Sequence, residues 1–343
     1  MIPETSILIV HVNGEDILKE CLSSVFKNSP KSTRVFVLFN STSDGSREMV
    51  KKNFPRVHFF SSEELLGFAE ASNFLARKTS SPYLVFLNND AVVGERWLTS
   101  LLRTLENHPR CAACQPKVRS YHSRENFEYA GAGGGFIDKY GYPFCRGRIF
   151  NSIEKDREQY DDEIRIFWAS GVCLFIRRED FEDAGGFDED FFMYAEEVDL
   201  CWRLNLFGKE VWYSPKSVIY HVGSYSVKKA NFHSKKDYLI IRNHLFLLLK
   251  NYSWWSLVKI LPFRILLEIL SAIRFFPSWT LASLKSFFSV PWIFFTKLRK
   301  KRKAIQKRRS VLDRELRSLM YLKSIALSHF IFHKKTFKEL RIG

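Results

Sequence analysis

Residues 6–14 read SILIVHVNG, and the first five of them form a short, mostly apolar run. A continuous run of this length is typical of a strand in the middle of a parallel sheet, where both faces are buried. Residues 15–27 follow with apolar side chains at helical spacing. The start of the chain is therefore predicted to form a strand, a short loop and a helix.

The same alternation continues outward from this stretch. Further apolar strands are predicted at 35–39, 57–60 and 83–87, with a turn-forming cluster at 40–46 and a helix at 68–78. Repeated strand–helix units predict an α/β fold with a Rossmann-like, doubly wound and mostly parallel sheet. In such sheets the ligand site lies at the carboxyl ends of the strands, and Asn13, Asn40 and Asp90 follow predicted strand ends.

The middle of the chain contains a second set of predicted elements. Residues 120–165 are rich in Gly and polar side chains, which favours a long active-site loop. A strand at 172–177 and a helix from residue 179 to the Gly pair at 185–186 come next. An aromatic and acidic loop at 187–194 then leads into a helix at 196–207, which Gly208 ends.

The net charge of +16 is unevenly distributed. Residues 1–226 hold 27 Lys and Arg against 32 Asp and Glu, whereas residues 227–343 hold 26 against 5 and so carry +21. The basic residues of the second part are mixed with Phe, Trp, Leu and Ile, which favours an anionic membrane surface over nucleic acid. The six Cys residues and the absence of a signal peptide before the first strand predict a reduced, cytoplasmic setting.

The C-terminal part is predicted to contain three helices, at 237–250, 254–276 and 279–303. Charged residues interrupt each apolar stretch before it reaches the length of about 20 residues that a membrane-spanning helix needs. The interrupting residues are Lys259, Arg264, Glu268, Arg274 and Lys285. We therefore expect a catalytic domain at 1–234 and an amphipathic, basic helical region at 235–343 that lies on a membrane.

Two groups of residues have side chains suited to chemistry. Asp90 follows a buried strand and His221 follows the apolar residues 217–220, so the two can bind a divalent cation together, although each can also be purely structural. Glu196, Glu197 and Asp199 open a helix, where acidic residues also stabilise the helix dipole. Because Asp199 can pair with Arg203 four residues later, Glu197 is the predicted general base.

Taken in order, these motifs resemble the family 2 glycosyltransferases of the GT-A fold, in particular the rhamnosyltransferase-like branch that acts in bacterial cell-surface polysaccharide assembly. The resemblance covers about residues 5–250. It is carried by the segments 6–14, 40–46, 66–73, 88–90 and 185–203, followed by Gly208, Pro215 and His221.

The resemblance implies an inverting transferase that uses a UDP-, dTDP- or GDP-sugar, with Glu197 as its base. Mg²⁺ or Mn²⁺ would be held by Asp90, His221 and Asn88. Residues that would bind the nucleotide sugar are Val10, Val12, Asn13, Asn40, Asp44, Gly67, Phe68, Asn73 and Asn89. Residues that would line the donor and acceptor cleft are Trp168, Gly171, Glu196 and Asp199.

The expected partner is a glycan or lipid-linked acceptor at the cytoplasmic face of the inner (plasma) membrane, where the protein would be peripheral, and no nucleic acid is expected. Two alternatives stay open. The acceptor can be soluble or a protein, or the chain can be a catalytically impaired member. The second alternative follows from Phe39, Asn88 and Glu197, which stand where the family usually has Asp.

Overall fold

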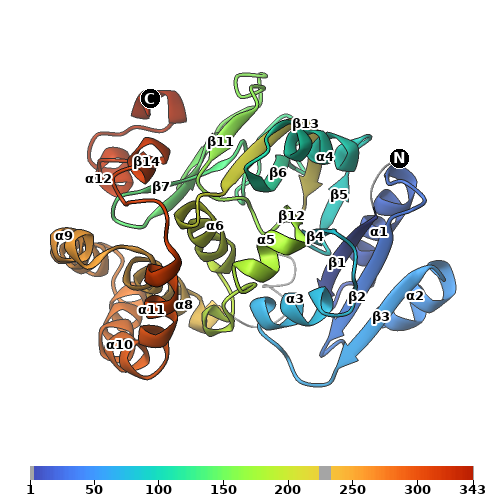
Figure 1. Cartoon of the computed structure of the whole chain (residues 1–343), viewed down its shortest axis with the longest axis horizontal. Coiled ribbons are helices and arrows are strands. Elements are labelled where there is room, and N and C mark those ends of the chain that lie inside the picture. Colours follow the sequence, from blue (N-terminus) through green and yellow to red (C-terminus); the bar gives the residue numbers. More distant parts are fainter. Residues whose placement is uncertain (1–3, 224–232, 343) are drawn as a thin grey trace.

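A computed structural model describes residues 4–223 and 233–342. Within them the main sheet has nine strands in the order β11-β13-β6-β12-β4-β1-β2-β3, and β5 pairs with β13 (Figure 1). The strands are β1 (Thr5–His11), β2 (Arg34–Asn40), β3 (Val57–Ser62), β4 (Tyr83–Leu87), β5 (Ala91–Val93), β6 (Cys111–Ser120), β11 (Ile164–Ile166), β12 (Cys173–Arg177) and β13 (Glu210–His221).

The sheet is α/β as predicted, but it is mixed rather than mostly parallel. β1 pairs in parallel with β2 and β4, and β2 pairs in parallel with β3. In contrast, β12 runs antiparallel to both of its neighbours, β4 and β6. Hydrophobic periodicity marks a strand without giving its direction, which explains why the prediction missed this reversal.

Alternate side chains of each central strand enter two separate cores. In β1, Leu8 belongs to one core, while Ile7 and Ile9 belong to the other. The first core contains α3 (Phe68–Ala76), α5 (Arg178–Asp183) and α6 (Glu196–Leu206), whereas the second contains α1 (Glu15–Asn28), α2 (Ser46–Asn53) and α4 (Trp97–Asn107). Both faces of the sheet are therefore covered by helices, as expected for buried strands.

The region 120–165 contains short strands where a long loop was predicted. Within the described residues, a second sheet has five strands in the order β10-β9-β8-β7-β14. Its strands are β7 (Gly135–Asp138), β8 (Pro143–Cys145), β9 (Arg148–Ile149), β10 (Ser152–Ile153) and β14 (Met320–Tyr321). Because β14 comes from the end of the chain and pairs in parallel with β7, its pairing could not be inferred from local sequence.

The C-terminal helices pack together beside α6 (Figure 1). The predicted helix at 279–303 is divided by a π-helical segment. The elements are α8 (His233–Asn251), α9 (Trp254–Arg274), α10 (Ser278–Ile293), the π-helix η2 (Phe294–Leu298), α11 (Arg299–Arg308), the 3₁₀ helix η3 (Leu316–Leu319), α12 (Ile325–Phe330) and α13 (Phe337–Leu340). No helix in the described ranges is long and apolar enough to cross a bilayer. The division at residues 234 and 235 stays a prediction.

Helix α9 buries an ion pair and exposes many of its large apolar side chains. Arg264 and Glu268 form a buried ion pair, and Arg264 also donates a hydrogen bond of 2.9 Å to the carbonyl of Tyr140. The opposite side exposes large apolar side chains, among them Trp255, Val258, Leu266, Ile269, Leu270 and Ile273. Two of the charges that interrupt the apolar sequence of this helix thus attach α9 to the rest of the protein.

We expect Glu268→Ala to lower the free energy of unfolding by about 3–5 kcal/mol, because the substitution leaves the Arg264 guanidinium buried without its carboxylate. Thermal or chemical unfolding measures the loss. Lys259→Ala, an exposed position on the same helix, is the matched control and should change stability by about 0.5 kcal/mol or less. Equal stability of the two variants would contradict a structural role for the pair.

Candidate functional site

The loops that follow β1 and β2 are joined by hydrogen bonds. The backbone N–H of Gly14 donates to Asp44 Oδ2 at 2.6 Å, and the Asn13 amide donates to Ser43 Oγ at 3.3 Å. Burial alone would raise the pKa of the Asp44 carboxyl, but the hydrogen bonds from Gly14 and Ser46 outweigh it and lower the pKa. Asp44 is therefore held as a carboxylate at the carboxyl end of the parallel strands.

Asn40 and Asn73 use their side chains to fix other loops. Asn40 exchanges two hydrogen bonds of 2.9 Å with the backbone of Leu66, directly before Gly67 and Phe68. Asn73 does the same with the backbone of Phe187, at 2.9 and 3.0 Å. Both amides thus position the backbone around the site, and the predicted contact of these residues with a nucleotide sugar stays a prediction.

His11 connects the ends of β1 and β4 and was not predicted as a site residue. Its Nδ1 lies 2.8 Å from the Asn89 amide nitrogen, and its Nε2 lies 2.9 Å from Ser46 Oγ. The ring is completely buried, while Val10 and Val12 on either side are partly exposed. A His directly after the first strand was the available signal, but a lone His gives no indication of its partners.

Asp90 and His221 are brought together by strand pairing. β5 begins at Ala91 and pairs antiparallel with the end of β13, so that Ala91 lies opposite His221. As a result, Asp90 Oδ1 lies 3.0 Å from His221 Nε2, and the Asn88 amide nitrogen lies 3.3 Å from the same ring atom. The three residues predicted as metal ligands therefore meet at one place, although they span more than a third of the chain.

Glu128 is a further member of this group that sequence reasoning missed. Its Oε2 lies 3.1 Å from His221 Nδ1, so a carboxylate stands at each ring nitrogen of His221. Burial alone would lower the pKa of His221, but Asp90 and Glu128 outweigh this effect and raise the pKa to about 10. In the absence of another cation, the imidazole therefore carries the positive charge that the two carboxylates require.

The donor atoms at this place fit a divalent cation in type. A carboxylate and an amide oxygen suit Mg²⁺ or Mn²⁺, and a deprotonated imidazole can complete such a set by losing its proton when the cation binds. Among the residues that the structure describes, however, no group of three or more His, Cys, Asp and Glu side chains is arranged to hold a metal ion.

Glu196 and Glu197 open α6 at the end of the aromatic loop. Burial raises the pKa of Glu197 to about 7. Burial, together with the charge of Glu197, raises the pKa of Glu196 well above its ordinary value. At neutral pH Glu197 therefore lies close to its midpoint, as a general base requires.

Glu197 lies at the same edge of the sheet as Asn88 and Asp90. Its Cγ and Cδ would each be 3.9 Å from a Cβ added to Gly171, so the side chain packs over that glycine. The residue after Gly171, Val172, accepts a backbone hydrogen bond of 2.9 Å from Asn88. The predicted base therefore lies over the residue next to Val172, to which Asn88 donates, and the crevice shared by Glu197, Asp90 and His221 stays a prediction.

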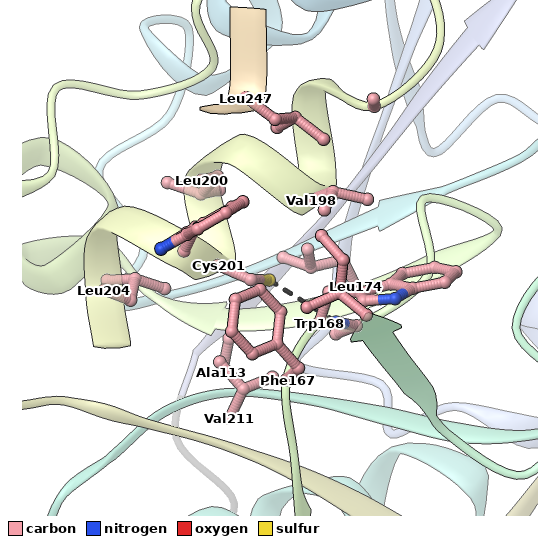
Figure 2. Close-up of a cluster of buried hydrophobic side chains, with 14 of the residues drawn as sticks. Ala113, Phe167, Trp168, Leu174, Val198, Leu200, Cys201, Leu204, Val211 and Leu247 are labelled. Carbon is pink, nitrogen blue, oxygen red and sulfur yellow. Dashed lines mark hydrogen bonds between the residues drawn. The ribbon is translucent and has the colours of Figure 1, made fainter. Parts of the chain in front are cut away.

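The position of α6 itself is set by core packing. Val198, Cys201 and Leu204 lie close to Phe167 (Figure 2), and Cys201 Sγ accepts a hydrogen bond of 3.4 Å from the backbone of Ala169. Trp168 is buried and donates to the carbonyl of Phe136 at 2.7 Å. Trp168 thereby ties the strand before Gly171 to the second sheet.

Asp199 forms the ion pair with Arg203 that helical spacing predicted, with Nε 2.8 Å from Oδ2. Lys250 of α8 adds a second cation at 2.9 Å from the same oxygen. A nearby cavity of about 600 Å³ is lined by Lys250, Lys301 and Asp188 but not by Asp90, His221 or Glu197. Of the residues predicted to bind the nucleotide sugar, Asn73 lines this cavity, which lies apart from the predicted metal ligands and base.

Sequence comparison gives relatives with known activities. The chain is 26% identical over 262 residues to an N-acetylglucosaminyl-diphospho-decaprenol L-rhamnosyltransferase of Mycobacterium tuberculosis, which covers 69% of this chain and 82% of the relative. It is 23% identical over 220 residues to rhamnosyltransferase WbbL of Escherichia coli K12, covering 61% and 80%. The similarity extends beyond the catalytic motifs to most of each relative.

Solved structures share the fold. One is GalNAc-T7 with UDP, GalNAc and Mn²⁺, with a TM-score of 0.58 and 15% identity. The match covers 86% of this chain but only 56% of that longer protein. Another is the mannosyltransferase PcManGT of Pyrobaculum calidifontis with GDP-Man and Mn²⁺, with a TM-score of 0.50, 14% identity and coverage of 86% of that chain.

The family model of glycosyl transferase family 2 matches residues 6–185, slightly more than half of the chain. This match agrees with the α/β sheet, with the structural neighbours and with the rhamnosyltransferase relatives. The resemblance inferred from the motifs is confirmed: the chain belongs to glycosyl transferase family 2.

Proposed function

We propose that this glycosyltransferase moves a sugar, with inversion, from a UDP-, dTDP- or GDP-sugar to a lipid-linked glycan acceptor in the synthesis of a cell-surface polysaccharide. The proposal is supported by the rhamnosyltransferase relatives, one of which is named for a diphospho-decaprenol acceptor. The observation that carries it is the position of Glu197, a largely buried carboxyl with a pKa of about 7 beside the strand end that holds Asp90.

In the proposed step, Glu197 removes the proton from an acceptor hydroxyl while the hydroxyl oxygen bonds to the anomeric carbon. The bond between that carbon and the diphosphate oxygen breaks, and the nucleoside diphosphate leaves with the bonding electrons. Attack opposite the leaving group inverts the anomeric centre. Burial and the charge of Glu197 raise the pKa of Glu196 well above its ordinary value, which disfavours a second negative charge beside the base.

The diphosphate of the donor would be placed at Asp90, His221 and Asn88 with Mg²⁺ or Mn²⁺. The bound cation supplies Lewis-acid stabilisation of the charge on the leaving diphosphate. The loop residues Asn13 and Asp44, together with Gly67 and Phe68, would surround the nucleotide at the neighbouring strand ends.

We also propose that α9 and α10 place the enzyme on an anionic membrane at the cytoplasmic face of the inner (plasma) membrane, where a lipid-linked acceptor is available. A helix on a water-facing surface exposes mainly polar side chains, whereas α9 and α10 bury several polar side chains and expose large apolar ones. α10 buries Ser283 and Ser286 while it exposes Phe288 (81%) and Trp292 (73%), and α9 exposes Trp255 (82%). After α10 the chain exposes four positively charged side chains, which attract anionic lipid. They are Lys297, Arg299, Lys300 and Lys303.

We expect turnover to rise with pH through about 7, because the Glu197 carboxyl must lose its proton before it can act as a base. Glu197→Gln should lower kcat by roughly 10²–10⁴-fold, the usual contribution of a general base. Release of nucleoside diphosphate from UDP-, dTDP- and GDP-sugars measures both. Full turnover by Glu197→Gln would reject the role of Glu197, and loss of turnover in every variant and condition would favour an impaired member.

We expect Asp90→Asn to abolish the Mn²⁺-dependent part of nucleotide binding, since the substitution removes the negative charge from the proposed cation site. A thermal-shift panel of UDP, dTDP and GDP, with and without Mn²⁺, measures the effect. Glu163→Gln, a surface carboxyl that pairs with His108, is the control and should keep the Mn²⁺-dependent shift. The same shift in Asp90→Asn and wild type would contradict the assignment.

We expect the triple variant Trp255→Ser, Phe288→Ser, Trp292→Ser to lose binding to vesicles and to stay folded, because all three side chains are exposed. Sedimentation with phosphatidylglycerol–phosphatidylcholine vesicles measures binding. Lys297→Gln, Lys300→Gln and Lys303→Gln together should weaken binding to the anionic vesicles on the order of 100-fold, at about 1 kcal/mol per charge.

The matched control for the membrane test replaces exposed apolar residues outside α9 and α10, with Leu65→Ser and Ile153→Ser. These variants should bind vesicles like the wild type. Wild-type vesicle binding by the triple variant would overturn the docking surface. Absence of vesicle binding by the wild-type chain would favour the alternative of a soluble or protein acceptor.

A further inference from the structure

The loop that leads into Glu196 and Glu197 has a strained backbone. Phe192, Tyr194 and Ala195 all have positive φ angles, of 63°, 72° and 69°. Residues with side chains rarely adopt this left-handed conformation, and they keep it only where the surrounding structure holds them. The direction in which Glu197 points therefore depends on what holds this loop.

The side chain of Asn243 on α8 contacts three carbonyl groups of the loop. The amide nitrogen of Asn243 lies 3.0, 2.8 and 2.7 Å from the carbonyl oxygens of Phe191, Met193 and Tyr194. Asn243 is completely buried. The carbonyls on both sides of the positive-φ residue Phe192, and that of Tyr194 itself, are thus fixed to one point on a helix.

The neighbouring residue of α8 extends this contact. Arg242 Nη2 donates to the carbonyl oxygens of Asp190 and Phe191, at 3.0 and 2.9 Å. On another side, the loop packs against Gly67, where an added Cβ would lie 2.7 Å from the carbonyl oxygen of Phe192. The loop is therefore confined between α8 and the beginning of α3.

Helix α8 is itself attached to the start of the loop and to the helix after it. Lys250 bridges Asp188, near the start of the loop, and Asp199, which follows the loop on α6. Asn251 donates to the other oxygen of Asp199 at 3.0 Å. These contacts fix the position of α8, and with it Asn243, relative to α6. Asn243, which holds the loop, therefore cannot shift independently of Glu197.

We propose that Asn243 is a positioning residue for the transfer step: by holding the carbonyls of Phe191, Met193 and Tyr194, it fixes the loop that directs the Glu197 carboxylate towards the acceptor. This inference rests on the proposed role of Glu197 as the base. It gives the C-terminal helices a part in catalysis that is separate from membrane docking, because α8 carries the support for the loop while α9 and α10 expose the apolar surface.

The test is a steady-state comparison of full-length variants with the best donor from the nucleotide-sugar panel. Asn243→Ala should lower kcat on the order of 10- to 100-fold, as small misplacements of a reacting group do, with little change in the KM for the donor. A freed loop also admits water to Glu197, so the acid limb of the pH profile should move below its wild-type midpoint of about 7. The titratable neighbours are Glu196 and Cys201 of α6 and Tyr194 of the loop, and the variant replaces none of them.

Asn205→Ala is the matched control. Asn205 is also completely buried, and its amide donates to the carbonyls of Phe167 and Cys201, away from the loop. This variant should lose stability without moving the acid limb. Arg242→Ala removes two of the loop contacts from a less buried position. It should lower kcat and shift the acid limb in the same direction as Asn243→Ala, by a smaller amount. This variant provides the test if Asn243→Ala fails to fold.

The outcomes separate the two proposals. If kcat and the acid limb of Asn243→Ala and Arg242→Ala match the wild type, or if Asn205→Ala shows the same shift, Asn243 does not position the base. If Glu197→Gln keeps full turnover, the proposed function of Glu197 fails, whatever the Asn243 variants show.

Discussion

The carboxylate of Asp199 is completely buried, and the need to neutralise it shapes the structure around it. A buried charge without a partner is costly, so cations and donors must lie where the carboxylate lies. Arg203 of the same helix supplies one, and Lys250 and Asn251 of α8 supply the others. This requirement joins α6, which carries the proposed base, to residues of α8 that lie 51 and 52 positions after Asp199 in the chain.

The same principle explains the unusual C-terminal helices. α9 and α10 are attached to the protein through polar side chains, with the Arg264–Glu268 pair on α9 and buried Ser residues on α10. Many of their large apolar side chains face outward, while Leu257 and Leu267 of α9 and Val290 of α10 are buried in the core. In water an exposed apolar surface of this size is unfavourable, and such patches mark interaction surfaces. The amphipathic character expected from the sequence is present, with the polar side turned inward.

The candidate site depends on long-range strand pairing. Asp90 and His221 meet because the short strand β5 pairs with the last residues of β13, and Glu128 completes the surroundings of the imidazole. Glu197 reaches the same edge of the sheet because it packs on Gly171, just before β12 begins. Residues that are far apart in the chain therefore share one environment, which is how a few carboxyl groups acquire different pKa values.

The sequence by itself determined the features that depend on local pattern: the buried strands, the helix that begins at Glu196, the pairing of Asp199 with Arg203, and the family motifs. Only the tertiary structure decided the direction of β12, the pairing of β14 with β7, the approach of Glu128 to His221 and the contacts of Asn243 with the loop before Glu196. The physical reason is the separation along the sequence of the residues that contact each other. Periodicity and i,i+4 spacing report contacts between near neighbours, whereas a buried charge or carbonyl takes its partner from whichever distant segment the fold brings to it.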